Sequence, residues 1–117
     1  MQITTHTIRN TQVAELSSEN VLIKTAEDGA QLLADLYYQG LDLIIMQAKQ
    51  LSPTFFDLKS GLAGEVLQKC SNFRIRLTII GDFNNIKSKS LRDFIFESNK
   101  RKSVNFVGSI GEAMERV

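Results

Sequence analysis

Apolar and polar positions along the chain follow two periods, one of about two residues and one of about 3.6. Near the N-terminus, the β-rich runs MQITTHTIRN and QVAELSS are separated by Asn10 and Thr11, which predicts an antiparallel hairpin of strands near 2–9 and 12–17. The run LDLIIM at 41–46 is too short for an independent helix and too uniformly apolar for a surface strand. It therefore predicts a buried central strand.

Helical and extended segments alternate in the rest of the chain. Thr25 with Asp28 three residues later has the spacing of a helix cap, and Gly40 supplies a C-terminal stop. Ser52-Pro53 predicts the start of another helix, because proline is preorganised for the first helical position. The other expected elements are a short strand at 21–24, helices at 26–39 and about 90–100 (the latter capped by Ser90 and Asp93), a strand at 74–81, a last strand in VNFVG and a closing helix in SIGEAMERV.

This order predicts one α/β domain over residues 1–117. We expect a mixed sheet of about five to six strands, in which an N-terminal hairpin joins parallel strands through right-handed crossovers, with about four helices. A chain of this length buries enough surface for one core without a metal or disulfide.

Composition narrows the classes of partner. The chain is 43% apolar and 23% charged with a formal net charge of +1, which argues against a general polyanion binder. The run Lys100-Arg101-Lys102 has no interleaved aromatic platform, so we expect no nucleic-acid binding. No apolar stretch is long enough to cross a membrane and no signal-peptide pattern follows Met1, so we expect a cytoplasmic protein with no membrane partner.

The chain has one cysteine and one histidine, which argues against a Cys/His zinc site and leads us to expect no metal and no cofactor. A carboxylate-only site for a hard cation is left open. Cys70 lies on an apolar helical stripe and is expected to be a buried packing thiol. His6 is expected to be a packing or surface residue of the first strand. The stripe consists of Leu58, Leu62, Val66, Cys70 and Phe73.

The segment FFDLKSGLAGEVLQK at 55–69 places Gly61 and Gly64 at the start of a helix, where each glycine costs up to about 1 kcal/mol relative to alanine. Three interpretations are open. In the first, the glycines and Ala63 are small so that the helix can lie close on the sheet, and Ser60 and Asp57 cap exposed amides. Whichever functional interpretation holds, we predict that a leucine at position 64 destabilises the fold by preventing this close packing. Alternatively, the free N–H groups beside Lys59 bind an anion or a phosphorylated partner. In the third, the segment is a phosphorylation switch.

Polar residues after the buried strands suggest where a site would form. In an open α/β sheet, sites form beyond the carboxyl ends of parallel strands, where we expect Asp82 and Ser88 to join Ser60. The cluster Lys87, Lys89 and Arg92 is a candidate for holding phosphate there. Asp57 and Asp82 are a weak signal for an acid–base pair, because aspartate is a preferred cap and turn residue. An enzyme is therefore not our first expectation.

Four segments carry a resemblance to known families: YYQGLDLIIM, FFDLKSGLAGEVLQK, GDF and SKSLRDFIFESNK. Over its full length the chain resembles the small bacterial family called domain of unknown function 4180, whose name implies no activity. From about residue 13 onward it also resembles the STAS domain, the sulfate-transporter and anti-sigma-factor-antagonist module, in the order of its strands and helices. The second resemblance implies a STAS-like layer domain.

In anti-sigma-antagonist STAS proteins, the buried strand leads into an Asp-Ser-Ser-Gly-Leu motif whose second serine is phosphorylated by a partner kinase. The resemblance implies that Ser60, Gly61 and Leu62 match Ser-Gly-Leu and that Asp57 stands for the aspartate. The chain departs from the motif because two residues separate Asp57 from Ser60 and because Lys59 replaces the first serine.

These observations leave three hypotheses for function. The first is a non-enzymatic STAS-like module that binds a protein partner around Ser60 and the following helix, switched at Ser60. The second is a domain that binds a small, anionic ligand in the crevice at the helix start, and the third is an enzyme. The candidate partner- or ligand-binding residues are Asp57, Lys59, Ser60, Gly61, Gly64, Asp82 and Ser88.

Overall fold

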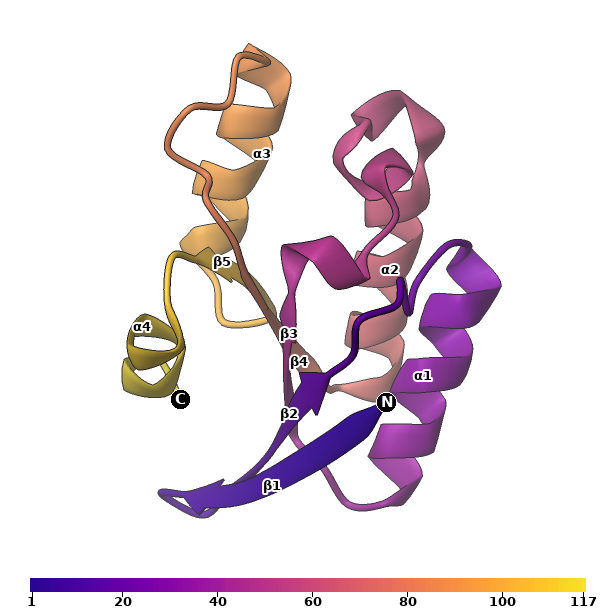
Figure 1. Ribbon diagram of the computed structural model, residues 1–117, viewed down its shortest axis with the longest axis vertical. Helices are drawn as coiled ribbons and strands as arrows, with labels where there is room; N and C mark the ends of the chain where they lie inside the picture. The colour runs from indigo at the N-terminus through magenta and orange to yellow at the C-terminus, as the bar shows by residue number, and fades with distance from the viewer.

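The computed structural model describes residues 1–117 as a five-stranded sheet, four α-helices and three short 3-10 turns. Figure 1 shows α1 and α2 side by side, with α3 standing apart from them and α4 away from all three. The elements are β1 (Gln2–Ile8), β2 (Thr11–Ser17), α1 (Ala26–Tyr38), β3 (Leu43–Gln47), 3-10 turns at Ala48–Gln50, Pro53–Phe56 and Leu58–Ser60, α2 (Leu62–Phe73), β4 (Arg76–Ile80), α3 (Lys89–Asn99), β5 (Val104–Val107) and α4 (Ile110–Glu115).

The strands are arranged in the order in which they occur along the chain, β1-β2-β3-β4-β5. β1 pairs with β2 antiparallel, and every later pair is parallel. This confirms the predicted α/β class, the N-terminal hairpin and the buried strand at the centre of the sheet. The hairpin turn is Arg9-Asn10, one residue earlier than predicted, and both residues have the positive φ (48° and 66°) that a tight two-residue turn needs.

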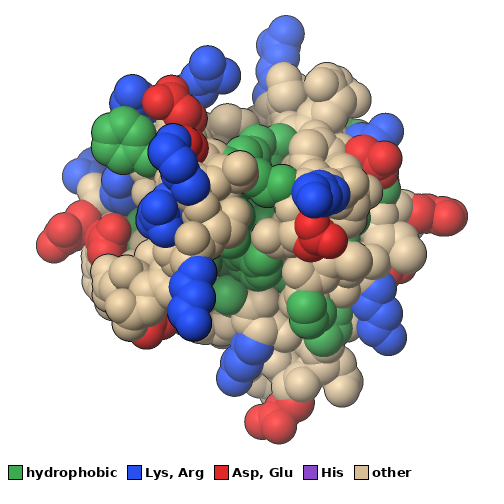
Figure 2. Space-filling model, turned by 90° about the horizontal axis from the view of Figure 1, so that it is seen from above, with side chains coloured by type: hydrophobic (Ala, Val, Ile, Leu, Met, Phe, Trp, Pro, Cys, Tyr) green, Lys and Arg blue, Asp and Glu red, His purple; other side chains and the backbone are tan.

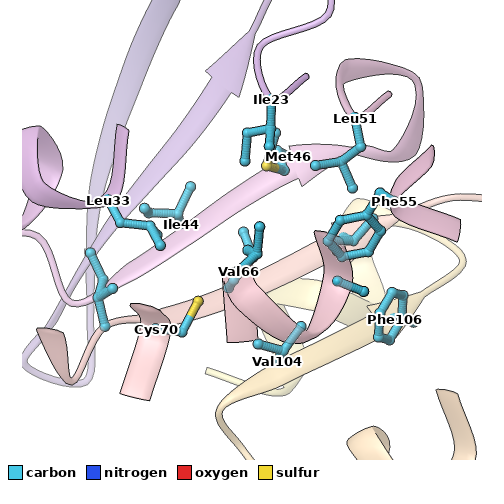
Figure 3. Close-up of a cluster of buried hydrophobic side chains, with 14 of the residues drawn as sticks. Ile23, Leu33, Ile44, Met46, Leu51, Phe55, Val66, Cys70, Val104 and Phe106 are labelled. Atoms are coloured by element: carbon cyan, nitrogen blue, oxygen red, sulfur yellow. The ribbon is translucent and has the colours of Figure 1, made fainter. Parts of the chain in front are cut away.

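The main core lies between the sheet and α1, α2 and α3. Because side chains alternate along a strand, Ile44 and Met46 of β3 point to the same face, where they meet helix residues such as Leu33 and Val66. Figure 3 shows these side chains converging, with Val104 contributed by β5. All three crossover helices therefore cover one face of the sheet.

The opposite face is covered by α4 alone. Leu43 and Ile45, the alternate residues of β3, pack with Ala113 of α4 in a second, smaller cluster. Arg76 of β4 donates hydrogen bonds to the backbone oxygens of Lys102 and Arg116, both at 3.0 Å, which ties the end of the chain to the sheet. Burial, together with the nearby Arg116, lowers the pKa of Arg76.

Three sequence predictions for element boundaries were wrong. Residues 21–24 form no strand, because Ile23 makes only an isolated bridge to Leu51. Pro53 begins a short 3-10 turn that ends at Asp57, where the backbone is extended, and α2 starts nine residues after Pro53, following Gly61 in a left-handed conformation (φ 80°). α3 is capped by Ser88, whose Oγ accepts the Leu91 N–H at 3.2 Å, and not by Ser90.

Candidate functional site

The segment between β3 and α2 consists of consecutive tight turns, each closed by a side chain. Ser52 caps the second turn, Pro53–Phe56, with its side chain, and the Asp57 carboxylate accepts the Lys59 N–H at 3.2 Å at the start of the third. Asp57 and Ser60 thus belong to one 3-10 turn instead of a continuous α-helix. The carboxylate at Asp57 has a local structural role, which follows from the preference of aspartate for turn starts.

Ser60 is exposed immediately before α2. Its hydroxyl donates a hydrogen bond to the backbone oxygen of Thr54 at 2.6 Å and accepts the N–H of Leu62 at 3.2 Å. Both bonds lie at the surface, where water can replace them if the side chain is modified. The hydroxyl is therefore accessible and also orients the start of α2.

The two glycines at the start of α2 do not bring the helix close to the sheet, so the close-packing part of the first interpretation was wrong, whereas the expected capping by Asp57 and Ser60 is confirmed. A Cβ atom placed on Gly61 or on Gly64 would meet no other atom within 4 Å. Gly61 is needed for its left-handed backbone, whereas Gly64 has an ordinary helical backbone and is exposed. Ala63 is the small residue that is buried. The backbone at Gly64 is left open to solvent.

Gly64 lines the larger of two hollows beside α2, a groove of about 460 Å³ between α2 and α3. We call it the α2–α3 groove. Its apolar residues are Leu67, Phe94 and Val104, and Arg101 stands among its polar ones. Figure 2 shows apolar side chains in a hollow at the centre of the upper face, with Lys and Arg side chains around it.

Ser60 lines the smaller hollow, of about 220 Å³, on the other flank of α2. Lys24 and Thr25 from the start of α1 share this hollow with Glu65 from α2. The first amides of α1 are already occupied, since the Thr25 hydroxyl accepts the N–H of Asp28 at 3.1 Å. With Asp28 and Glu65 close to the two helix starts, this hollow offers an anion little net positive charge.

The expected crevice beyond the carboxyl ends of the strands is filled. A chain of aromatic contacts occupies this region, with Phe106 at its centre and ring-centroid distances of 5.5 Å to Phe83 and 6.0 Å to Phe94. Phe55 and Phe56 extend the cluster. The strand order never reverses and all crossover helices share one face, so the sheet has no topological switch point at which such a crevice opens.

Asp82 and Ser88 have local roles in the loop before α3. The Asp82 carboxylate accepts the N–H of Asn84 at 3.1 Å, and Ser88 caps α3. Neither residue lines the α2–α3 groove or the smaller hollow that holds Ser60. The two hollows therefore contain Ser60 and Gly64 but none of the other candidates: Asp57, Lys59, Gly61, Asp82 and Ser88.

Most basic residues of α3 are already engaged. Lys89 pairs with Asp93 at 2.8 Å and Lys100 with Glu97 at 3.1 Å. Arg92 donates to the backbone oxygens of Ile86 and Lys87, so it closes the preceding loop. The side chain of Arg101 has no ion pair and no hydrogen bond within the chain. It is the cation of the groove that is available to a partner.

The structure holds no group of three or more His, Cys, Asp or Glu side chains placed to bind a metal ion. Cys70 lies on the buried face of α2, as predicted, and burial raises the pKa of its thiol to about 12. Its thiol is therefore protonated at neutral pH and is not an activated nucleophile.

The sequence analysis missed the groove residues of α3. Phe94, Glu97 and Ser98 have the spacing of one helix face, and Arg101 follows in the bend after the end of α3. That spacing was readable in the sequence. Nothing in it indicated that this face would remain uncovered by α2.

No helix in the structure combines the length and apolarity that a membrane span requires. A comparison with curated proteins finds no match. The family described as Domain of unknown function (DUF4180) matches residues 8–117, which is nearly the whole chain and includes β2, the turns before α2 and both walls of the α2–α3 groove. The chain belongs to this DUF4180 family.

Proposed function

We propose that the protein is a non-enzymatic regulatory module of the STAS type, which binds a protein partner in the α2–α3 groove beside the first turn of α2 and is switched at Ser60. The observation that carries this proposal is the open flank of α2. Gly64 leaves its backbone uncovered in a groove that is also lined by the apolar side chains of Leu67, Phe94 and Val104. A groove of this kind suits the apolar face of a partner helix.

The charges around the groove indicate the chemistry of the partner. Glu97 is neutralised by Lys100, whereas Arg101 has no acidic partner. A helix that presents apolar residues at i and i+4 together with one carboxylate would bury the apolar pair in the groove and reach Arg101. We therefore expect an amphipathic helix with an acidic residue, since complementary charges favour specificity and the rate of association.

The position of Ser60 supports regulation. Ser60 is exposed and ends the turn before α2, and its hydroxyl accepts the N–H of Leu62, the first residue of α2. A phosphate there would carry a charge of about −1.5 to −2 at pH 7. Lys24 and Lys59 favour this phosphate, whereas Asp57 and Glu65 oppose it. The STAS resemblance provides the precedent for a serine at this position.

The experiment is affinity capture from the native host with quantitative mass spectrometry, using variants of the chain as baits. Gly64→Gln fills the wall of the groove without a steric conflict inside the fold, and Ser60→Glu imitates a charged state. We expect both to reduce capture of one and the same protein by about tenfold, which corresponds to about 1.4 kcal/mol. The Ser60→Glu fold is expected to remain within about 1 kcal/mol of the wild type in denaturant unfolding.

Two control variants make the result specific. Lys69→Gln changes a residue of α2 that lines neither hollow, and Ser60→Ala removes the hydroxyl without adding charge. Both should capture the partner as well as the wild type does. Equal capture by wild type, Gly64→Gln and Ser60→Glu would show that the first turn of α2 is not the interaction surface. Loss of capture with Ser60→Ala as well would show a structural role for the hydroxyl.

A further inference from the structure

The two edge strands of the sheet, β1 and β5, differ in whether other parts of the chain cover their free backbone groups. At the β5 edge, the Asn99 side chain from α3 accepts the N–H of Phe106 at 2.8 Å and donates to its backbone oxygen at 3.0 Å. Ser98 adds a hydrogen bond of 2.7 Å to the backbone oxygen of Val104. These side chains occupy the positions that a further strand would need, so the β5 edge is sealed.

The β1 edge has no such cover. The tight turn at Arg9-Asn10 makes Ile8 and Thr11 a hydrogen-bonded pair, and such pairs then alternate along the hairpin. Residues with even numbers therefore bond to β2, and the N–H and C=O groups of Ile3, Thr5 and Thr7 point away from the sheet. No side chain or backbone group of the chain bonds to them.

β1 also lacks the features with which proteins protect an edge strand. Its sequence QITTHTI has no lysine, no other permanently charged residue and no proline. All seven of its residues pair with β2 in an unbroken register, so no bulge turns the strand away. Protected edges normally carry at least one of these features.

We propose that β1 is the interface of a homodimer in which two copies pair their β1 strands antiparallel about Thr5, joining the two sheets into one. This register places Thr5 opposite itself and Ile3 opposite Thr7, so that all the free backbone groups of both strands are bonded. Thr4 then faces His6, and no two like charges meet within the paired strands Gln2–Ile8. The pairing is self-complementary, as a two-fold interface requires, and all crossover helices stay on one face of the joined sheet.

The charge pattern selects a second copy as the occupant over an unrelated strand. An edge that recognises a foreign peptide needs pockets or charges for alternate side chains, whereas the side chains of β1 are small or uncharged along its length. This surface lies on β1 and contains no residue of the α2–α3 groove or of the smaller hollow. The dimer is therefore independent of the function proposed above.

Cysteine crosslinking tests the register. In the proposed pairing the two Thr5 Cα atoms are about 5.5 Å apart, within the range that a disulfide spans. Thr7 is also an exposed threonine of β1, but its two copies would be about 14 Å apart. With oxidised glutathione, Thr5→Cys should form a covalent dimer about tenfold faster than Thr7→Cys. The native Cys70 is buried and should not contribute.

Association itself is measured by sedimentation equilibrium over a range of protein concentrations. We expect a reversible dimer for the wild type and about fivefold weaker association for Thr5→Lys, because two lysines then oppose each other at the two-fold axis. Thr4→Lys, with its lysine opposite His6, should weaken association less. Hydrogen exchange should slow with concentration at Ile3, Thr5 and Thr7, which a variant that fails to fold cannot imitate.

A wild-type chain that stays monomeric at every concentration would overturn the proposal, whether the edge then takes a strand from another protein or none. Equal crosslinking rates for Thr5→Cys and Thr7→Cys would do the same, since they would show that the strands do not pair about Thr5. A dimer whose association is unchanged by Thr5→Lys would also overturn it, because the contact would then lie elsewhere.

Discussion

The two flanks of α2 contrast sharply. On one flank α1 lies so close that a Cβ atom on Gly29 would be only 3.1 Å from Cγ2 of Val66. On the other flank α3 stands away, and Gly64 faces a groove with no atom within 4 Å. α1 can therefore lie close to α2 because Gly29 of α1 has no side chain. The flank of α2 that carries Gly64 is open.

This contrast shows that a glycine in a helix is not in itself a signal of close packing. Both glycines lie in the first turn of their helix, but Gly29 is on the buried face of α1, which Leu33 and Leu36 continue, whereas Gly64 is on an exposed face of α2. The environment of the position decides which role the missing side chain has. At Gly29 the role is structural, and at Gly64 an open backbone remains for an outside contact.

The largest expected effect concerns what holds α3 away from α2. Phe106 is 3% exposed and contacts Phe55, Phe83 and Phe94, so it supports α3 from the sheet. Phe106→Ala should cost about 3–5 kcal/mol of the free energy of unfolding, because it leaves a cavity under α3. Denaturant titration followed by circular dichroism gives this value.

Phe96 provides the matched control for that change, because it is a phenylalanine of α3 that is 64% exposed. Phe96→Ala should alter stability by no more than about 0.5 kcal/mol. If the two substitutions cost the same, the aromatic cluster would not be what positions α3.

The second prediction compares leucine on the two flanks. Gly29→Leu should destabilise the protein by about 1–3 kcal/mol, because the larger side chain must displace Val66 or separate α1 from α2. Gly64→Leu, the matched change on the open flank, should leave stability unchanged or higher. The test is to measure the melting temperatures of the two variants side by side. A larger decrease in melting temperature for Gly64→Leu than for Gly29→Leu would contradict the comparison.

A smaller effect is expected from alanine at the open flank. Gly64→Ala should raise the free energy of unfolding by up to about 1 kcal/mol, since alanine restricts the unfolded chain and has a higher helix propensity. The gain is measured from the denaturant midpoint. A loss of stability would indicate that Gly64 contacts another part of the chain.

The smallest effect separates the starts of the two helices by pH. The Asp28 carboxylate accepts the N–H groups of Lys24 and Thr25 at 3.0 and 3.1 Å, and the bond from Lys24 is the main reason that its pKa lies below the ordinary 3.8. The unfolded chain therefore binds this proton more readily. The ionised Asp28 carboxylate therefore contributes its full stabilisation at pH values above the pKa of the unfolded chain. This stabilisation is lost as pH falls below 3.8.

Unfolding of wild type and Asp28→Asn between about pH 6 and pH 2 tests this contribution. The difference in their denaturant midpoints should be largest near pH 6 and shrink as the solution becomes acidic. The start of α2 should not contribute a similar dependence of stability on pH. Its N-cap residue, Gly61, has no side chain, and the N–H of Leu62 is bonded to the uncharged Ser60 hydroxyl. A constant difference across the range would exclude a role for the charge of Asp28.

Local patterns predicted the fold to the extent that local chemistry controls it. LDLIIM was recognisable as a buried strand, the Thr25–Asp28 pair as a cap and Cys70 as a packing residue, because hydrophobic period and capping depend on near neighbours. The start of α2 was missed, because Pro53 can begin either an α-helix or a single 3-10 turn. The extended backbone of Asp57 ends the turn that Pro53 begins, and the left-handed backbone of Gly61 sets the start of α2.

The candidate site was predicted in part. Ser60 was expected at an exposed helix start and lies there, whereas Asp82 and Ser88 were expected beside it and instead close their own loop. Which loops meet at the end of a sheet depends on strand order and on the face that each crossover helix covers. Neither property is encoded in the spacing of residues within one loop.

The sequence by itself determined most of the alternation of strands and helices, the hairpin at the start and the apolar stripe of α2 from Leu62 to Cys70, because these follow from side-chain periodicity and local hydrogen bonding. Only the tertiary structure decided that α1 closes on α2 while α3 stands apart, that phenylalanines fill the carboxyl end of the sheet, and that one sheet edge is sealed by Asn99 while β1 is free. The physical reason is that these features depend on contacts between residues far apart in the chain, where the volume and direction of each side chain are set by its partners.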